Sequence, residues 1–461
     1  MTHRMLDLSR ITRPASLVAA LFLAGACSRQ ELLNVETPDQ VTPEAVNSPA
    51  GAQALRAAAI GVFSNFYGGT ANVGTNLYVG LLSDELINAR PGADHLDIRS
   101  FNPNVFPNVA WNNFAQAYTA IVRATRSVQQ YAQAGAAKNS QLGQLYVLKG
   151  YALTIAGELY CNGVPLSDVN DASPKFAIVS NTEMQQRAVA SLDSGLALLT
   201  TTGADLNQRY ASRIGKARAL VNQRRFGDAA TVTRAGGDGA GSAAVPTSFV
   251  YNQEYSAATL VNTIFDWMVN TANFGPSDRE GGNGLDFRSA RDPRVPTSTT
   301  FRLGQDGSTQ VFTIQGYPNG ASPTILASGV EARLIEAESD LTSNNPTGWL
   351  ANLNAARADA AARTARGIAT TSDVLTPLTD PGSDATRVDL LFRERAFWMY
   401  LQAHRVGDLR RLVRQYARAA TAVWPTGAYF KGGTYGTDQN ITPSIAERNN
   451  PDWKACTNRD P

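Results

Sequence analysis

The sequence predicts a mostly α-helical protein, built of helical hairpins with long irregular loops and a few short strands, in a single compact unit. Two observations carry this prediction: apolar residues recur at helical spacing in many segments, and strand-like runs are few and short. The apolar fraction of 43% and the charged fraction of 17% are those of a globular protein with a sizeable core. This composition excludes a generally disordered chain.

The first segment, residues 1–26, has the pattern of a secretory signal peptide. Three arginines precede an apolar run that is shorter than the roughly 20 residues of a membrane-spanning helix. The run ends in Leu23-Ala24-Gly25-Ala26-Cys27, which resembles a bacterial lipobox, although Ala24 stands where a leucine is usual. The same residues fit ordinary Ala-x-Ala cleavage. We therefore expect an exported chain that is lipidated at Cys27, with a secreted chain that keeps a free Cys27 as the alternative.

Residues 27–49 are predicted to form an extended tether, because Thr-Pro and Ser-Pro pairs disfavour helix in the residue before each proline. The body then divides into a helical-repeat region at 50–235, a loop-rich insertion at 236–325 and a C-terminal region at 326–461. In the first of these regions, apolar side chains return at helical spacing. This spacing predicts helices over residues 50–66, 111–131, 141–160, 182–199, 211–221 and 229–232.

The last two of these helices are rich in alanine, and the turn between them contains Gly227 and Asp228. A helix, a short turn and a second helix with small residues is the rhythm of a tetratricopeptide unit, in which paired helices pack closely. The full tetratricopeptide signature is absent. We therefore expect tetratricopeptide-like hairpins rather than strict repeats.

The C-terminal region continues the helical pattern. Apolar residues surround the helix predicted at 387–403 on nearly all sides, so Glu394 and its neighbouring arginines must be paired to be tolerated there. We expect them to form a buried ion-pair network. The spacing predicts further helices at 330–341, 349–363 and 408–420, and a strand at 309–314.

Cys161 and Cys456 are the two cysteines that follow Cys27. In an exported protein they suggest one long-range disulfide, and two separate buried thiols are the alternative.

The sequence has no catalytic motif. His95 and His404 stand in no metal-ligand spacing, no Gly-x-Ser-x-Gly elbow occurs, and the glycine cluster at 235–244 lacks the Gly-Lys-Ser/Thr ending of a phosphate loop. The net charge of +2 creates no strong field towards nucleic acid. We therefore expect no catalytic residue, metal, cofactor or nucleic-acid partner.

The segment 388–412 resembles the C-terminal signature of SusD/RagB-like outer-membrane lipoproteins, Glu-Arg-x-x-Glu-Leu-x-x-Glu-Gly-x-Arg-x-x-Asp-Leu-x-Arg. It departs from that signature at Trp398, Met399, Gln402 and Ala403. Four further segments are similar to family motifs, in family order: 150–165, 292–294, 333–338 and 353–357. The residues that match the signature are Glu394, Arg395, Arg405, Asp408, Leu409 and Arg411.

This resemblance implies a lipid-anchored outer-membrane protein on the cell surface that is not an enzyme. Proteins of the family capture an oligosaccharide, or sometimes a peptide, and close as a lid over a SusC-like TonB-dependent transporter. Their repeat hairpins face the transporter and their loops hold ligand. A periplasmic tetratricopeptide-like protein-interaction module and an exported glycan hydrolase are the alternatives.

An oligosaccharide is the expected ligand, because aromatic faces stack on sugars and amides bond hydroxyl groups. Three segments rich in such residues are candidate binding loops, at 65–78, 102–113 and 267–283. Trp111 stands at a helix start and is expected in the core. The candidate ligand contacts are Tyr67, Asn76, Tyr78, Trp267 and Asn283.

Overall fold

The computed structural model describes residues 46–70, 73–92, 94–101, 109–167, 176–239, 241–365 and 375–460. The chain divides into two units, Met1–Asn47 and Ser48–Pro461, and the second is one compact unit. The expected signal peptide, Cys27 and almost all of the expected tether lie outside the described residues. Within the described ranges, no helix combines the length and apolar character that crossing a membrane requires.

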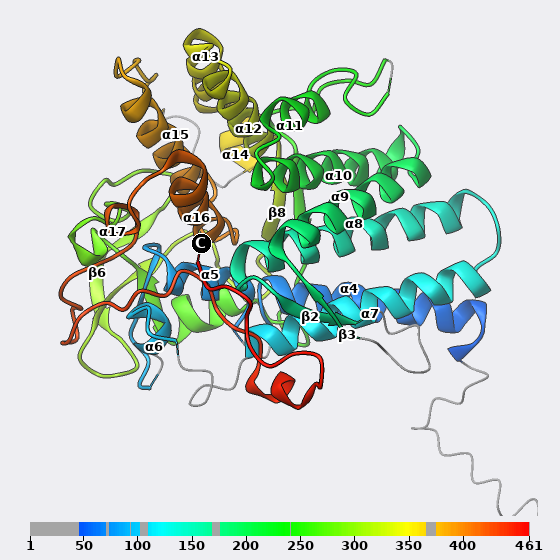
Figure 1. Ribbon diagram of the computed structural model, residues 1–461, viewed down its shortest axis with the longest axis horizontal. Helices are drawn as coiled ribbons and strands as arrows, with labels where there is room; N and C mark the ends of the chain where they lie inside the picture. Colours follow the sequence, from blue (N-terminus) through cyan, green and yellow to red (C-terminus); the bar gives the residue numbers. More distant parts are fainter. Residues whose placement is uncertain are drawn as a thin grey trace, which may run out of the picture. The chain divides into compact units, whose positions relative to one another are not determined.

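The first half of the unit is a stack of helices in which each contacts the next, as Figure 1 shows. The mostly α-helical prediction is confirmed, because the observed helices cover nearly all of the predicted ranges. The stack consists of α4 (Pro49–Tyr67), α7 (Val109–Tyr131), α8 (Ala136–Leu159), α9 (Asn181–Leu198), α10 (Gly203–Asn222) and α11 (Phe226–Thr233).

Small residues let these helices approach closely. A Cβ atom at Gly150 of α8 would lie 2.4 Å from Cγ of Leu192 on α9, and one at Gly143 would lie 2.5 Å from Cδ2 of Leu199. Real Cβ atoms essentially never lie this close to a neighbour, so a larger residue at either position would force the leucine side chain to move or the two helices to separate. The helix starts are also encoded locally, since Ser48 and Ser180 cap α4 and α9 by accepting hydrogen bonds from main-chain N–H groups.

Half of the loop predicted at residues 65–78 is helical in the structure, so the prediction is wrong for residues 65–67 and 75–78. Phe66 and Tyr67 are the last turn of α4, and α5 (Thr75–Leu82) begins inside the predicted loop. Every residue of α5 is buried. Tertiary burial therefore overrides the turn signal in these two helical parts, and the described residues 68–70 and 73–74 lie outside both helices.

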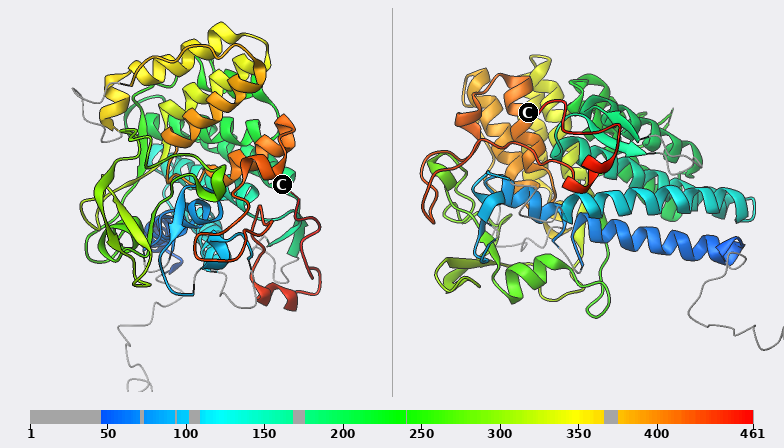
Figure 2. Two further views of the ribbon diagram at one scale, coloured as in Figure 1. Left: turned by 90° about the vertical axis from the view of Figure 1, so that its left-hand side faces the viewer. Right: turned by 60° about the horizontal axis from the view of Figure 1, so that its bottom comes forward.

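The C-terminal helices pack against the end of the stack (Figure 1 and Figure 2). The predicted helix 349–363 is interrupted at Asp359, whose Oδ1 caps the next turn by accepting from the N–H of Ala362 at 2.7 Å. The predicted helix 387–403 ends at Trp398, because Leu401 and Ala403 have positive φ. These helices are α12 (Gly329–Thr342), α13 (Pro346–Ala358), α14 (Ala360–Ala365), α15 (Asp384–Trp398), α16 (Arg405–Tyr416) and α17 (Ala420–Val423).

The described strands form two-stranded antiparallel pairs, and β7 matches the predicted strand at 309–314. The pairs are β1 (Leu86–Asn88) with β5 (Phe274–Pro276), β2 (Val164–Ser167) with β3 (Phe176–Val179), β4 (Val250–Gln253) with β8 (Thr324–Ser328), and β6 (Thr297–Leu303) with β7 (Gln310–Ile314). Short helical turns complete the fold: α6 (Asp94–Asp97), a π-helix (Phe265–Asn270) and 3-10 turns (Glu280–Gly282 and Ile445–Asn449).

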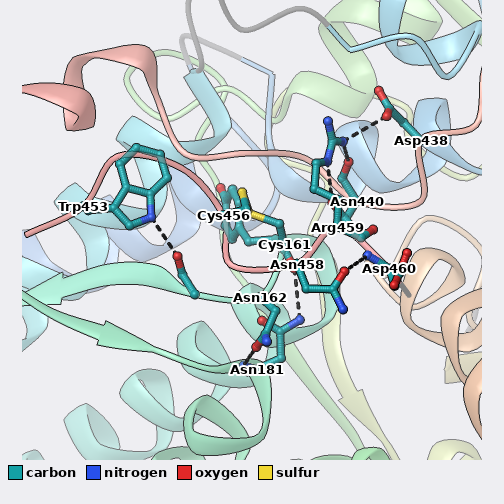
Figure 3. The surroundings of a disulfide bond; sticks show 12 residues. Cys161, Asn162, Asn181, Asp438, Asn440, Trp453, Cys456, Asn458, Arg459 and Asp460 are labelled. Carbon is teal, nitrogen blue, oxygen red and sulfur yellow. Dashed lines mark hydrogen bonds and ion pairs between the residues drawn. A yellow bond between two sulfur atoms is a disulfide. The ribbon is translucent and has the colours of Figure 1, made fainter.

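Cys161 and Cys456 form a disulfide bond in the structure (Figure 3). The bond ties the end of α8 to the C-terminal tail, which is 295 residues away in sequence. Hydrogen bonds reinforce it, since the N–H of Cys161 donates to the carbonyl of Ile441 at 3.0 Å and Trp453 Nε1 donates to the carbonyl of Gly163 at 2.7 Å. The tail is thereby held against the helical stack.

Candidate functional site

The charged residues of the C-terminal signature lie in the core and pair with one another. Glu394 Oε2 is 2.7 Å from Arg294 Nη1, and its Oε1 is 2.7 Å from Arg357 Nη1. Asp292 Oδ2 also pairs with Arg294, at 2.7 Å from its Nη2. The residues come from three segments far apart in sequence, so the ion pairs join the Asp-Pro-Arg turn, α13 and α15.

A second cluster centres on Asp408 of α16. Arg395 and Arg411 contact its two carboxylate oxygens at 2.9 Å each, and Arg411 also reaches Glu338 of α12 at 2.5 Å. Burial alone would raise the pKa of Asp408, but the two guanidinium groups hold it below its usual range. The prediction of a buried ion-pair network is therefore confirmed.

A third cluster joins the helical stack to the same C-terminal helices. Arg218 donates to Glu158 from Nε at 2.9 Å, and its Nη1 lies 3.0 Å from His404 Nε2. Glu331 lies beside this cluster, and burial raises its pKa to about 7.

A separate ion pair joins Arg405 to Asp84. Arg405 binds both carboxylate oxygens of Asp84, at 2.6 and 2.8 Å. We call these three clusters and the Arg405–Asp84 pair the charge network, and its buried members have no surface to offer a ligand.

Three of the five candidate ligand contacts are buried as well. Tyr67 and Asn76 have no exposed surface and Tyr78 is 1% exposed. The Tyr67 hydroxyl donates to the carbonyl of Ile325 at 2.5 Å, and this hydrogen bond connects α4 to β8. The interpretation of these three residues as ligand contacts is corrected accordingly, because side chains enclosed in the core cannot stack on a sugar.

Trp267 and Asn283 are half-buried and engaged in packing. The Trp267 ring stacks on Phe274 at 5.7 Å and lies under the guanidinium of Arg90 at 4.7 Å. Asn283 Nδ2 donates to the carbonyl of Trp424 at 2.7 Å. The candidate loop 267–283 does contribute to a surface cavity, but through residues 276 and 278–281 rather than through these two. Residues 102–108 of the remaining candidate loop lie outside the described residues, and its end forms the start of α7.

Two adjoining cavities, of about 250 and 510 Å³, open beside the β6–β7 hairpin and share Arg288 and Phe312 as walls. We call them together the groove. Its walls come from residues 276–299, from β7 and from the segment 428–435 near the C-terminus. Beyond the two shared walls, the smaller cavity is lined by Ile87, Pro276, Asp278, Arg279, Glu280, Gly281, Gln310, Ala428, Phe430 and Tyr435, and the larger by Ser289, Arg291, Asp292, Pro293, Val295, Pro296, Thr297, Ser298, Thr299 and Gln315.

Aromatic faces and polar groups alternate along the groove. Phe430 is 48% exposed and packs against the ring of Tyr429 at 4.6 Å. The guanidinium of Arg288 lies over the ring of Phe312 at 4.2 Å. Such a surface combines flat apolar platforms with hydrogen-bonding groups, which is the chemistry that binds a sugar ring and its hydroxyl groups.

A buried pair of carboxyl groups fixes the wall that carries Phe430. Tyr429 donates to Asp97 and Tyr435 donates to Glu280, each at 2.8 Å. Burial raises the pKa of both acids, and the repulsion between them raises that of Glu280 further. These raised pKa values favour a protonated form of the pair, which relieves the repulsion. Lys431 adds ion pairs at 3.0 Å to Asp94 and to Asp306 in the β6–β7 turn.

Sequence reasoning missed the groove because its walls are separated by more than 100 residues of chain. One local signal was available: Phe430 and Lys431 stand directly before Gly432 and Gly433, and both glycines have positive φ. Phe430 lies outside every described helix and strand, and its side chain stays 48% exposed. Among the residues that the structure describes, no group of three His, Cys, Asp or Glu side chains is placed to hold a metal ion.

No protein-family model and no curated protein matches the chain by sequence. Solved structures do match, and the three described below are 12–14% identical to this chain. A SusD superfamily protein from Bacteroides vulgatus is 12% identical, with a TM-score of 0.59 over 89% of this chain and 99% of that one. The chain has the SusD-like fold.

Two further SusD-like structures match over most of their length. A SusD-like carbohydrate-binding protein from Bacteroides vulgatus is 14% identical, with a TM-score of 0.56 over 78% of this chain and 83% of that one. A laminarin-binding SusD-like protein is 12% identical, with a TM-score of 0.52 over 82% of this chain and 96% of that one. The resemblance found in the sequence motifs is confirmed at the level of the fold, and residues of those motifs supply most of the charge network of this SusD-like chain.

Proposed function

We propose that this protein is a cell-surface lipoprotein that captures an oligosaccharide in the groove. The observation that carries the proposal is the exposed Phe430 ring beside the Arg288–Phe312 stack, in a cavity with polar walls. The SusD-like fold supports it, since two proteins with this fold are described as carbohydrate-binding and laminarin-binding. The captured ligand would pass to a SusC-like TonB-dependent transporter, with Cys27 as the lipid anchor.

The binding step is tested with Phe430→Ala on a glycan and peptide array. We expect signal on oligosaccharides, and we expect Phe430→Ala to weaken it about tenfold, which is roughly 1.4 kcal/mol. Stability should change little, because the ring is half exposed. Leu303→Ala is the matched control. Leu303 is the last residue of β6, is 56% exposed and lies outside the groove lining.

Three outcomes would contradict the proposal. Peptide binding without any oligosaccharide signal would overturn the ligand class. An equal loss of oligosaccharide binding in Phe430→Ala and Leu303→Ala would show that the ligand does not bind in the groove. Turnover of a bound oligosaccharide would favour the hydrolase alternative.

The delivery step has a separate check in the genome. A gene for a TonB-dependent receptor directly upstream of the gene for this chain would support transfer to a transporter. Association with soluble periplasmic proteins instead would favour the interaction-module alternative.

A further inference from the structure

Arginines line the whole length of the groove. Arg279 lies in the smaller cavity, Arg291 in the larger one, and Arg288 belongs to both. With a net charge of only +2 over the chain, this concentration is local rather than a general property of the surface.

The carboxylates of the groove do not neutralise all three arginines. Asp278 pairs with Arg288 at 3.2 Å, and Asp292 is committed to Arg294 in the charge network. Glu280 is buried beside Asp97 and accepts a hydrogen bond from the hydroxyl of Tyr435. Arg279 and Arg291 are exposed, and neither forms an ion pair with any residue that the structure describes.

The backbone at these two arginines is in an unusual conformation. Arg279 has φ of 54° and Arg291 has φ of 50°, in the left-handed region that favours glycine. Main-chain hydrogen bonds hold both turns, since the N–H of Arg279 donates to Leu285 at 2.9 Å and that of Arg291 to Arg288 at 3.2 Å. The guanidinium groups are therefore not needed for these turns, although a residue with a long cationic side chain stands where glycine would fit without strain.

We propose that the oligosaccharide held in the groove carries anionic groups, carboxylate or sulfate, which bind Arg279 and Arg291. This inference rests on the proposed function of the groove. A guanidinium presents N–H donors in a fork that matches a carboxylate or a sulfate, and a charged hydrogen bond is about twice as strong as a neutral one. The exposed aromatic face of Phe430 binds a sugar ring, and the arginines select the charged members.

The test measures binding of the full chain, solubilised in detergent, to pairs of oligosaccharides that differ only in charge. The probes are oligogalacturonate and alginate oligosaccharides, each with its carboxyl-reduced counterpart, and carrageenan oligosaccharides, whose anionic groups are sulfates, with their desulfated, neutral counterpart. We expect an acidic member to bind at least tenfold more tightly than its neutral counterpart at low salt, with an advantage that shrinks as salt is raised. Preference within the carboxylate or the sulfate pairs distinguishes the two kinds of anion.

Arg279→Gln and Arg291→Gln should each reduce that advantage about tenfold and leave binding of neutral oligosaccharides unchanged. Arg126→Gln on α7 is the control, because Arg126 is exposed and far from the groove lining while the substitution removes the same charge. Circular dichroism checks that all three variants fold.

The outcomes separate this inference from the proposed function. Neutral and acidic members that bind equally, with no effect of the groove arginines, would overturn the inference while the groove stands as a neutral glycan site. A loss in Arg126→Gln equal to that in the groove variants would also overturn it. Absence of binding to every oligosaccharide, charged or neutral, would overturn both.

Discussion

The charge network and the groove use the same residue type in opposite ways. In the network, the side chains of Arg395 and Arg411 are 2% and 1% exposed, and each lies within 3 Å of a carboxylate. In the groove, Arg279 and Arg291 are exposed and free of ion pairs among the described residues. Burial and partners, rather than residue type, decide whether an arginine holds the fold or meets a ligand.

The two regions also differ in what a lost charge does. A buried ion that loses its partner stays in the core without compensation, whereas an exposed ion is solvated by water and screened by salt. Substitutions in the network should therefore change the free energy of unfolding, and substitutions in the groove should change binding.

The largest effect is expected for Glu394→Ala. The substitution leaves Arg294 and Arg357 buried without their shared carboxylate, so we expect a loss of about 3–5 kcal/mol in the free energy of unfolding, measured with urea. Asp389→Asn is the control on the same helix, because the Asp389 side chain is 64% exposed and, among the described residues, forms an ion pair with Arg418 alone. It should cost less than about 1 kcal/mol. Similar losses in the two variants would break the distinction between the regions.

A pH-dependent effect of intermediate size is expected for Glu331→Gln. The pKa of Glu331 is about 7 in the fold against a reference value of 4.5, because burial disfavours its charged form. A raised pKa stabilises the fold below pH 4.5, and this contribution is lost as the pH rises through 7. Over that window it amounts to roughly 3 kcal/mol. Glutamine does not titrate, so the free energy of unfolding should fall less for the variant than for the wild type between pH 5 and 8. Parallel pH profiles of the two proteins would contradict the raised pKa of Glu331.

The smallest effect on stability is expected for Asp278→Asn in the groove. The amide oxygen still accepts from the N–H of Ser289, and only the ion pair with Arg288 is lost. The free energy of unfolding should change by less than about 1 kcal/mol. Because the substitution removes a negative charge beside Arg279, binding of an acidic oligosaccharide should tighten a few-fold in a titration at low salt. Weaker binding would speak against an anionic ligand.

Local patterns were enough to predict most of the helices. The residues of α7 and α9 alternate between core and solvent at helical spacing, so their sequence alone carries the signal. The pairing of Glu394 was predictable for a related reason, since a charge in a helix that is apolar on nearly all sides needs a partner. The identity of that partner was not predictable, because Arg294 is 100 residues away and meets it only in the fold.

The candidate ligand contacts failed for a physical reason. Tyr67, Asn76 and Tyr78 belong to a stretch rich in glycine, asparagine and aromatic residues, a composition shared by binding loops and by tightly packed helix junctions. Only burial distinguishes the two, and burial depends on what packs over the segment. Here β8 and the C-terminal helices cover it, and the Tyr67 hydroxyl bonds to main-chain atoms there.

Local patterns were sufficient to predict the helical class, most helix positions, the need for buried ion pairs and the resemblance to SusD-like proteins, because periodicity and motif spacing are local properties of the chain. Which charges pair, which aromatic residues remain exposed and where the groove lies depend on packing between distant segments. Residues 276–299 and 428–435 have no local reason to meet. The carboxyl pair of Asp97 and Glu280, with its two tyrosines, brings them together, and contacts over such separations form only when the whole chain folds.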